Sequence, residues 1–254
     1  MHTCLLSIFQ GEDRPKLDIW RGNMRKIGII GLGNMGISMA KNLIKNGFDL
    51  TGFDLNPDRM PLLVKLGGKQ AINCQEVGQN ADIVFIMVLN GKQVKEAILG
   101  EQGLLEGLKP NSTIIVSATV NPSEIREIEQ AVLDQNVNLV DSPVSGGQPG
   151  AETGTLTLMA ATKKEVFDDI KPVLEAIGKD IFHVGQEIGL GQTVKASLQA
   201  LIGTSFTAIF ESLVLGVKAG VNAEILYEVF RTTSVGGPLF ENASRLILDR
   251  QFKD

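Results

Sequence analysis

From Lys26 onward, short apolar runs alternate with stretches of helical pattern along the chain. Seven of these runs have the continuous apolar character of strands that are covered on both faces of a sheet. They span residues 26–31, 50–54, 82–88, 113–117, 138–144, 156–161 and 180–184. Strands that alternate with helices in this way predict a parallel sheet wrapped by helices.

Glycines mark the predicted ends of two of the intervening helices. The helix over residues 35–46 ends before Gly47, and the helix over residues 163–177 closes at Gly178. Glycine is common just after a helix because it adopts a left-handed conformation without steric cost. This first lobe extends to about residue 186.

The β pattern stops beyond residue 186, and the remaining chain has helical patterns. Residues 192–219 form one long predicted helix whose apolar side chains cover more than one face. We expect this helix to be buried on most sides, between two lobes or against a second subunit. The expected assembly is therefore a homo-oligomer formed through the helical part. Two shorter helices are predicted over residues 223–231 and 238–248.

The N-terminal segment differs from the rest of the chain. Its short apolar run at residues 4–9 is followed by acidic residues, which fits neither a secretory signal nor a mitochondrial transit peptide. We divide the chain into a disordered extension (1–23), an α/β domain (24–186) and a helical domain (187–254). The long helix carries a charge and several polar groups, so no membrane span is expected.

The composition of the 254 residues is that of an ordinary globular protein, with 43% hydrophobic and 21% charged residues. The net charge is −5 and aromatic residues make up 5%, so the chain lacks the basic excess and the stacking surface that nucleic-acid binding needs. The two cysteines and two histidines do not stand at zinc-ligand spacing. No metal site is expected, and a reducing cytoplasm is the expected location.

Gly31, Gly33 and Gly36 form a G-x-G-x-x-G sequence that follows a predicted strand and opens a predicted helix. In that context the first glycine permits a tight turn, the second lets the backbone approach a pyrophosphate, and the third lets the helix pack close to the strand. The free N–H groups and partial positive charge of the helix N-terminus would bind phosphates. The motif predicts a dinucleotide-binding site.

Asp54 ends the second predicted strand, 23 positions after Gly31. A carboxylate about 20 residues after the glycine motif binds the ribose hydroxyls of NAD and would repel a 2′-phosphate. NAD is therefore the expected cofactor, although Arg59 nearby keeps NADP open. The alternative is that Asp54 only caps the turn into Asn56 and Pro57.

Three further segments follow predicted strands, and ligands of open parallel sheets lie at such strand ends. Leu89 would form an apolar wall beside the nicotinamide, with Asn90 next to it, and Thr119 would offer a hydroxyl to the nicotinamide ribose or the substrate. Ordinary turn chemistry is the alternative for each. The serine and two glycines at residues 145–147 could form a nest of N–H groups for a carboxylate.

Lys195 opens the long predicted helix, and Gln199 lies one turn later on the same face. A cation has the wrong sign for the positive end of a helix dipole, so its placement asks for a reason. A functional role is one such reason. A solvated terminal lysine is the alternative.

Three ordered blocks of the sequence resemble the β-hydroxyacid dehydrogenase family. IIGLGNMGISMAKNL (residues 29–43) is similar to the family's N-terminal signature, DSPVSGGQPGAETGTLTLMAA (141–161) to its substrate-loop block, and GLGQTVK (189–195) to the segment with its catalytic lysine. The resemblance covers the chain from about Met24 to the C-terminus. It implies a Rossmann domain with a doubly wound, mostly parallel sheet, followed by an all-α domain, with the active site in the cleft between them.

The resemblance also implies a reaction, the metal-free oxidation of a small hydroxy acid to a keto acid or semialdehyde by hydride transfer to NAD, with NADP less favoured. Lys195 would be the general acid/base, and a partly desolvated site would have to lower its pKa from ~10.4. The implied cofactor-binding residues are Gly31, Leu32, Gly33, Asn34, Met35, Gly36, Asp54, Leu89, Asn90 and Thr119, and the implied substrate-binding residues are Ser145, Gly146, Gly147 and Gln199.

The sequence departs from the family pattern in two places. Where family members commonly have two Asn residues after the lysine, this chain has Leu198 and Gln199. Three features of the sequence resemble the threonate dehydrogenase branch of the family: Gln199 and the segments at residues 117–119 and 240–242. A threonate-like sugar acid is therefore the expected substrate. The chain ends at Asp254, before the family's usual final helices, and is expected to be a truncated member with an incomplete helical domain. The alternative function is a catalytically inactive relative that acts as a dinucleotide-binding or interaction module.

Overall fold

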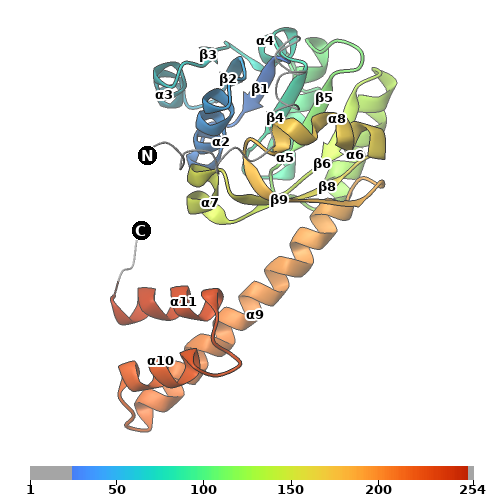
Figure 1. The fold of residues 1–254 in the computed structure, drawn as a ribbon. Helices are drawn as coiled ribbons and strands as arrows, with labels where there is room; N and C mark the ends of the chain where they lie inside the picture. The colour runs from blue at the N-terminus through green and yellow to red at the C-terminus, as the bar shows by residue number, and fades with distance from the viewer. Residues whose placement is uncertain (1–24, 251–254) are drawn as a thin grey trace, which may run out of the picture. The chain divides into compact units, whose positions relative to one another are not determined.

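The computed structural model describes residues 25–250, so the predicted extension at residues 1–23 lies outside the described residues. The chain divides into two compact units between Lys195 and Ala196. The first unit contains a sheet covered by helices, and the second is helical (Figure 1). This order confirms the predicted fold class.

The sheet of the first unit contains nine strands within residues 25–250. They are β1 (Ile27–Ile30), β2 (Leu50–Phe53), β3 (Lys69–Gln70), β4 (Ile83–Ile86), β5 (Thr113–Val116), β6 (Asn138–Asp141), β7 (Val144–Ser145), β8 (Leu156–Ala161) and β9 (Gly178–Gly185). Their spatial order is β3-β2-β1-β4-β5-β6-β8-β7, and β9 also pairs with β8. Neighbouring strands from β3 to β6 are parallel, whereas β8 runs antiparallel to β6 and β7.

The order of the strands reverses at β1, which pairs with β2 on one side and with β4 on the other. In open parallel sheets this switch point leaves a crevice at the carboxyl ends of the strands, where ligands bind. The glycine motif follows β1 directly. The topology therefore places the motif where a dinucleotide site is expected.

Helices cover both faces of the sheet. They are α2 (Asn34–Lys45), α3 (Met60–Lys65), α4 (Cys74–Gln79), α5 (Gly91–Leu99), α6 (Pro122–Asp134), α7 (Gly147–Thr153) and α8 (Lys164–Leu174), with 3-10 turns at Pro57–Arg59 and Leu104–Glu106. Alternate strand residues serve opposite faces: Ile29 packs with residues of α2, α3 and α8, whereas Ile30 packs with residues of α4, α5 and α6. Burial on both faces explains why the strands read as continuous apolar runs.

Two sequence predictions need correction. The helix predicted over residues 163–177 ends at Leu174, and Gly178 is the first residue of β9 rather than a helix cap. A Cβ atom at Gly178 would lie 2.0 Å from the Leu158 side chain, so this glycine serves the close pairing of β8 and β9. The run predicted as one strand at residues 138–144 is divided between β6 and β7.

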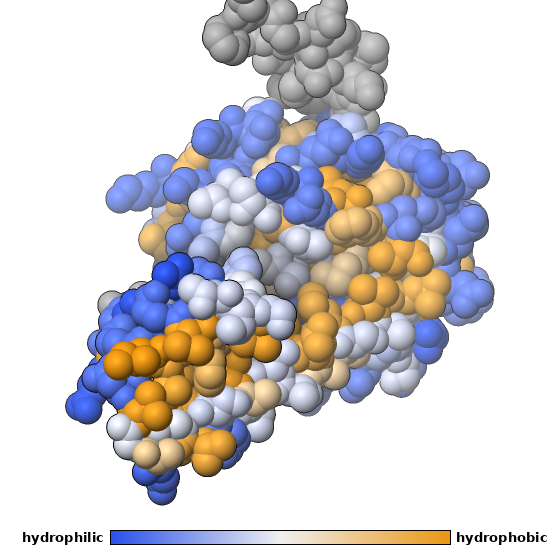
Figure 2. All heavy atoms as spheres, turned by 60° about the horizontal axis from the view of Figure 1, so that its bottom comes forward, coloured by the Kyte–Doolittle hydropathy of each residue, from blue (hydrophilic) through white to orange (hydrophobic). Residues whose placement is uncertain are grey.

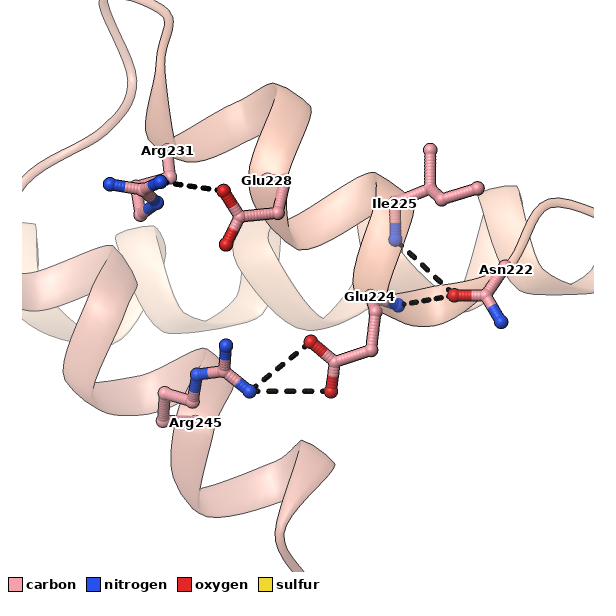
Figure 3. Close-up of polar contacts among 6 residues, drawn as sticks. All are labelled: Asn222, Glu224, Ile225, Glu228, Arg231 and Arg245. Carbon is pink, nitrogen blue, oxygen red and sulfur yellow. Dashed lines mark hydrogen bonds and ion pairs between the residues drawn. The ribbon is translucent and has the colours of Figure 1, made fainter.

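The long helix α9 (Leu190–Lys218) begins in the first unit and continues into the second, which also contains α10 (Ala223–Arg231) and α11 (Pro238–Leu248). The Arg245 guanidinium joins α11 to α10 by two 3.2 Å hydrogen bonds to the Glu224 carboxylate (Figure 3). The Arg245 guanidinium also lies 4.2 Å from the centre of the Tyr227 ring. Asn222 caps α10 by accepting the N–H groups of Glu224 and Ile225.

The apolar side chains of α9 are largely exposed within the described chain. Leu201, Val214 and Leu215 are 65%, 52% and 72% exposed, so the prediction that this helix is buried on most sides is not met by these residues. Figure 2 shows apolar side chains gathered on the surface of the helical unit. Within residues 25–250 there is one helix, α9, that is long enough and apolar enough to cross a membrane, judged by length and composition alone.

Candidate active site

The glycine loop after β1 has the geometry of a dinucleotide-binding turn. Gly31 has a φ of 91°, and a Cβ atom there would lie 2.3 Å from the Met87 carbonyl oxygen. A Cβ atom at Gly36 would lie 1.9 Å from the Gly31 carbonyl oxygen, because α2 packs closely on the strand. These two glycines are therefore required by the fold itself.

Gly33 differs from these two glycines, since a Cβ atom there would have no neighbour within 4 Å. Its φ of −60° is open to any residue, so nothing within the described chain demands a glycine. Gly33 lines a cavity and is the N-cap of the twelve-residue helix α2, where no side chain caps the free N–H groups. A cradle that a Cβ would fill, at an uncapped helix N-terminus, fits a pyrophosphate.

Asp54, which follows β2, anchors the loop as well as the next turn. One carboxylate oxygen accepts the Leu32 N–H at 2.5 Å, and the other accepts the Asn56 N–H at 2.7 Å. The turn-capping alternative is therefore correct for one oxygen. Each oxygen has a second lone pair, and Asp54 lines the same cavity as Gly33, so the carboxylate can still accept ribose hydroxyl groups.

The cavity at the switch point has a volume of about 550 Å³, within the size range of small-molecule sites. Gly31, Gly33, Asp54 and Leu89, all predicted to bind the cofactor, line it. The lining also includes residues that the sequence did not suggest, among them Ile72, Asn73, Cys74, Glu96, Glu101 and Gln102. These flank the two-residue strand β3 and the end of α5, which have no recognisable sequence signature.

The charge around this cavity is mainly negative. Asp54, Glu96 and Glu101 face it together with one cation, Arg59. Burial and the nearby Glu96 carboxylate raise the pKa of the Cys74 thiol to about 11. Three carboxylates and one guanidinium are thus the charged groups among the residues that line the cavity.

The other candidate residues near the nicotinamide end show mixed outcomes. Leu89 is 84% exposed and lines the cavity, so its role as an apolar wall beside the nicotinamide stays a prediction. Asn90 caps α5 by accepting the Gln93 N–H at 2.9 Å, so the turn-chemistry alternative describes its contact. Thr119 is exposed at the end of β5, while its neighbours Ala118 and Val120 are hydrogen-bonded to Gln192.

The predicted carboxylate nest lies at the start of α7. Ser145 pairs with Thr157 at the end of β7 and is half-buried, and Gly146 and Gly147 are exposed. The φ values of the two glycines are 119° and 59°, a left-handed pair that favours glycine. Within residues 25–250, no hydrogen bond or ion pair joins this segment to Lys195, so the nest stays a prediction.

Lys195 lies in the second turn of α9 and is only 8% exposed. Within residues 25–250 its ammonium group has no hydrogen bond or ion pair with another described side chain. Burial lowers the pKa of Lys195. This is the direction that a general base needs near neutral pH, and it speaks against the alternative of a solvated terminal lysine. Gln199, in the second unit, is exposed on the same helix one turn later.

Asp141 supplies a negative charge at the N-terminal end of α9. Its carboxylate accepts the N–H groups of Gly189 at 2.9 Å and Gln192 at 3.1 Å. Burial raises the pKa of Asp141, although these N–H donors act in the opposite direction. The carboxylate complements the helix dipole that Lys195 alone would oppose. Asp141 and Gln192 lie within residues 141–161 and 189–195, but the sequence pattern alone does not indicate that either belongs to the site.

The remaining described residues offer no obvious metal site. Within residues 25–250, no group of three or more His, Cys, Asp or Glu side chains could hold a metal ion.

Family models match both parts of the chain. Residues 26–185 match the family described as the NAD binding domain of 6-phosphogluconate dehydrogenase. Residues 189–254 match the family described as NAD-binding of NADP-dependent 3-hydroxyisobutyrate dehydrogenase.

Individual relatives cover most of the chain. The 2-(hydroxymethyl)glutarate dehydrogenase of Eubacterium barkeri is 39% identical over 82% of this chain and 69% of its own length. The L-threonate dehydrogenase of Escherichia coli K12 is 32% identical over 91% of this chain and 77% of its own length. The solved structure of 3-hydroxyisobutyrate dehydrogenase from Salmonella typhimurium is 32% identical, with a TM-score of 0.79, and the match covers 89% of this chain and 79% of that one.

Proposed function

Because the chain belongs to the β-hydroxyacid dehydrogenase family, which includes 3-hydroxyisobutyrate dehydrogenase, we propose that it is an NAD-dependent oxidoreductase of a small hydroxy acid. The product is the corresponding keto acid or semialdehyde. The observation that carries the proposal is the burial of Lys195, which lowers the pKa of its amine. Lys195 lies near the start of α9, and a hydrogen bond from the Gln192 N–H to Asp141 attaches this helix end to the carboxyl edge of the sheet.

The proposed cofactor is NAD rather than NADP. The glycine loop and the uncapped end of α2 would hold the pyrophosphate, and the Asp54 carboxylate would accept the ribose hydroxyls. A 2′-phosphate would face Asp54 and the other acidic residues of the cavity, with Arg59 as its one favourable partner among the lining residues. When bound, NAD supplies the nicotinamide ring that accepts a hydride from the carbinol carbon of the substrate.

Lys195 would perform the acid/base step. In the oxidation direction its neutral amine takes the proton of the substrate hydroxyl at Nζ while the carbinol carbon is oxidised. Ser145 and the N–H groups of Gly146 and Gly147 would hold the substrate carboxylate, and Gln199 would contact the remaining polar groups. A buried lysine with a lowered pKa supports this role, since an amine near its ordinary pKa would be almost entirely protonated at neutral pH.

The proposed substrate is a threonate-like sugar acid, with a 3-hydroxy acid as the second candidate. Gln199 and the similarity to L-threonate dehydrogenase support the sugar acid. The greater identity to 2-(hydroxymethyl)glutarate dehydrogenase supports a hydroxymethyl acid. The two candidates differ in the polar groups that surround the reacting hydroxyl.

The experiment is spectrophotometric detection of NADH with L-threonate, 3-hydroxyisobutyrate and 2-(hydroxymethyl)glutarate. The test variant is Lys195→Ala, and its matched control is Lys164→Ala. Lys164 is an exposed lysine on α8 that pairs with Asp168. We expect turnover that Lys195→Ala abolishes and Lys164→Ala preserves. Tight NAD binding without turnover of any acid would overturn the enzyme proposal and favour the dinucleotide-binding module.

We also propose that the protein is a homo-oligomer assembled through its helical unit. The exposed apolar residues of α9, α10 and α11 support this, among them Leu201, Leu215, Ile225 and Leu246. A patch of this kind on a soluble protein marks an interaction surface. A bilayer suits α9 less well, because Glu211 lies within the helix and charged residues are costly inside a membrane.

A further inference from the structure

We propose that Gln192 is a positioning residue of this site, whose side-chain amide fixes the lysine-bearing end of α9 against the loop that carries Thr119. The inference rests on the proposed function, because Lys195 and Thr119 take their roles from it. Gln192 itself lies in the first turn of α9, three residues before Lys195, and is 1% exposed.

The Gln192 side chain bonds the backbone on both sides of Thr119. Its Oε1 atom accepts the Val120 N–H at 3.0 Å, and its Nε2 atom donates to the Ala118 carbonyl oxygen at 3.0 Å. The carboxamide thus donates one hydrogen bond to the residue before Thr119 and accepts one from the residue after it. Two hydrogen bonds from one planar group fix the loop in distance and in orientation.

The backbone of the same residue is fixed to the neighbouring strand. The Gln192 N–H and the Gly189 N–H both donate to the Asp141 carboxylate at the end of β6. A Cβ atom at Gly191 would lie 2.6 Å from the Asp141 carbonyl oxygen and 2.5 Å from that of Met159, so the helix start lies directly against β6 and β8. Since β5 and β6 are adjacent, Gln192 joins two neighbouring strand ends to one helix.

This attachment matters because, within residues 25–250, no hydrogen bond or ion pair holds the Lys195 ammonium in place. A buried long side chain without a hydrogen bond keeps its position only through the helix from which it projects. Residues three apart lie on adjacent parts of a helix surface, so a shift of Gln192 would move Lys195 with it. Gln192 therefore sets the distance from the amine of Lys195 to the Thr119 loop.

A purely structural role would give a different result. If Gln192 only satisfied the polar groups of Ala118 and Val120, its loss would lower stability and leave the rate of the folded protein unchanged. A positioning role lowers kcat in the protein that remains folded, because a displacement of about 1 Å in reacting groups can lower a rate about 100-fold.

The test compares Gln192→Met, which keeps the length of the side chain but removes both hydrogen bonds, with Thr162→Val. Thr162 is 3% exposed, and its hydroxyl donates to the Leu139 carbonyl at 2.9 Å, so this control also loses a buried bond to backbone. We expect kcat to fall about 10- to 100-fold in Gln192→Met, with KM for the acid changed less than about threefold, and to stay within about twofold in Thr162→Val. Equal kcat values in the two folded variants would overturn the proposal.

A second readout does not depend on turnover. Reductive methylation with ¹³C-formaldehyde gives each lysine an NMR signal, and Lys195→Arg assigns the one from Lys195. In Gln192→Met this signal is expected to titrate closer to the ordinary lysine pKa, with Gln192→Asn as the variant of choice if the first does not fold. An unchanged Lys195 titration in either variant overturns the proposal. If the wild type oxidises no acid, the proposed function fails and the NMR titration still decides the role of Gln192.

Discussion

The carboxylate of Asp54 accepts the Leu32 N–H at 2.5 Å, although the two residues follow different strands. The side chain proposed to bind the ribose is thus part of the glycine loop that would bind the pyrophosphate. Both halves of the cofactor site depend on one residue. A change at Asp54 is therefore expected to affect cofactor affinity as well as cofactor choice.

Asp54→Asn replaces one of the two carboxylate oxygens by an NH2 group. This NH2 donor then faces the N–H donor of either Leu32 or Asn56, so that hydrogen bond is lost. Loss of hydrogen bonds to a charged group costs about 1.5–3 kcal/mol each, so we expect the Kd for NAD to rise about 10- to 100-fold. The preference for NAD over NADP should narrow. Isothermal titration with both cofactors measures this, with Asp58→Asn in the next turn as the control. An unchanged Kd for NAD would contradict the assignment of Asp54.

Gly33 and Gly36 are expected to respond differently to the same substitution. Gly33→Ala adds a methyl group to open space in the cavity, so the protein should fold with a Tm within a few degrees of the wild type, yet bind NAD at least about tenfold more weakly. Gly36→Ala places a methyl group 1.9 Å from a backbone oxygen and should reduce stability itself. Thermal melts with and without NAD distinguish the two. Normal NAD affinity in Gly33→Ala would exclude a pyrophosphate at this position.

The part of the cavity formed by the glycine loop and Asp54 could be predicted from the sequence because it is local. The glycine motif, the strand before it and Asp54 lie within one βαβ unit, where spacing alone fixes their relation. The Gln192 contact could not be predicted, since it joins residues 72 and 74 positions apart through a side-chain amide. Nor could the cavity wall at Ile72 and Gln102, because short elements such as β3 leave no periodic pattern.

Cys74 provides an independent probe of the cavity. With a pKa of about 11, its thiol is almost entirely protonated at neutral pH and should react with iodoacetamide far more slowly than an ordinary exposed cysteine. Because Cys74 lines the cavity, NAD should slow the reaction further. Mass spectrometry of the Cys4→Ser variant measures both rates. Fast alkylation that NAD leaves unchanged would place the cofactor elsewhere.

The proposed oligomer predicts a change in mass on substitution of the helical surface. Leu215 is 72% exposed on α9, and Leu215→Glu should shift the particle toward the monomer by placing a charge in the apolar interface. Phe182→Glu is the control, because Phe182 is 55% exposed on β9 in the other unit. Light scattering after size-exclusion chromatography reports the mass. A monomeric wild type would reject the proposed assembly.

Lys195 as the general acid/base is the central claim, and the pH dependence of kcat/KM tests it most directly. In oxidation the neutral amine is the active form, and burial lowers its pKa from 10.5, so the rate should rise with pH through an apparent pKa below that value. Reduction needs the protonated amine and should lose rate over the same range. Lys195→Arg, which stays charged, should lower the rate about 100- to 10,000-fold and remove this limb. A Lys195→Arg enzyme that keeps the wild-type rate and pH profile would contradict the account.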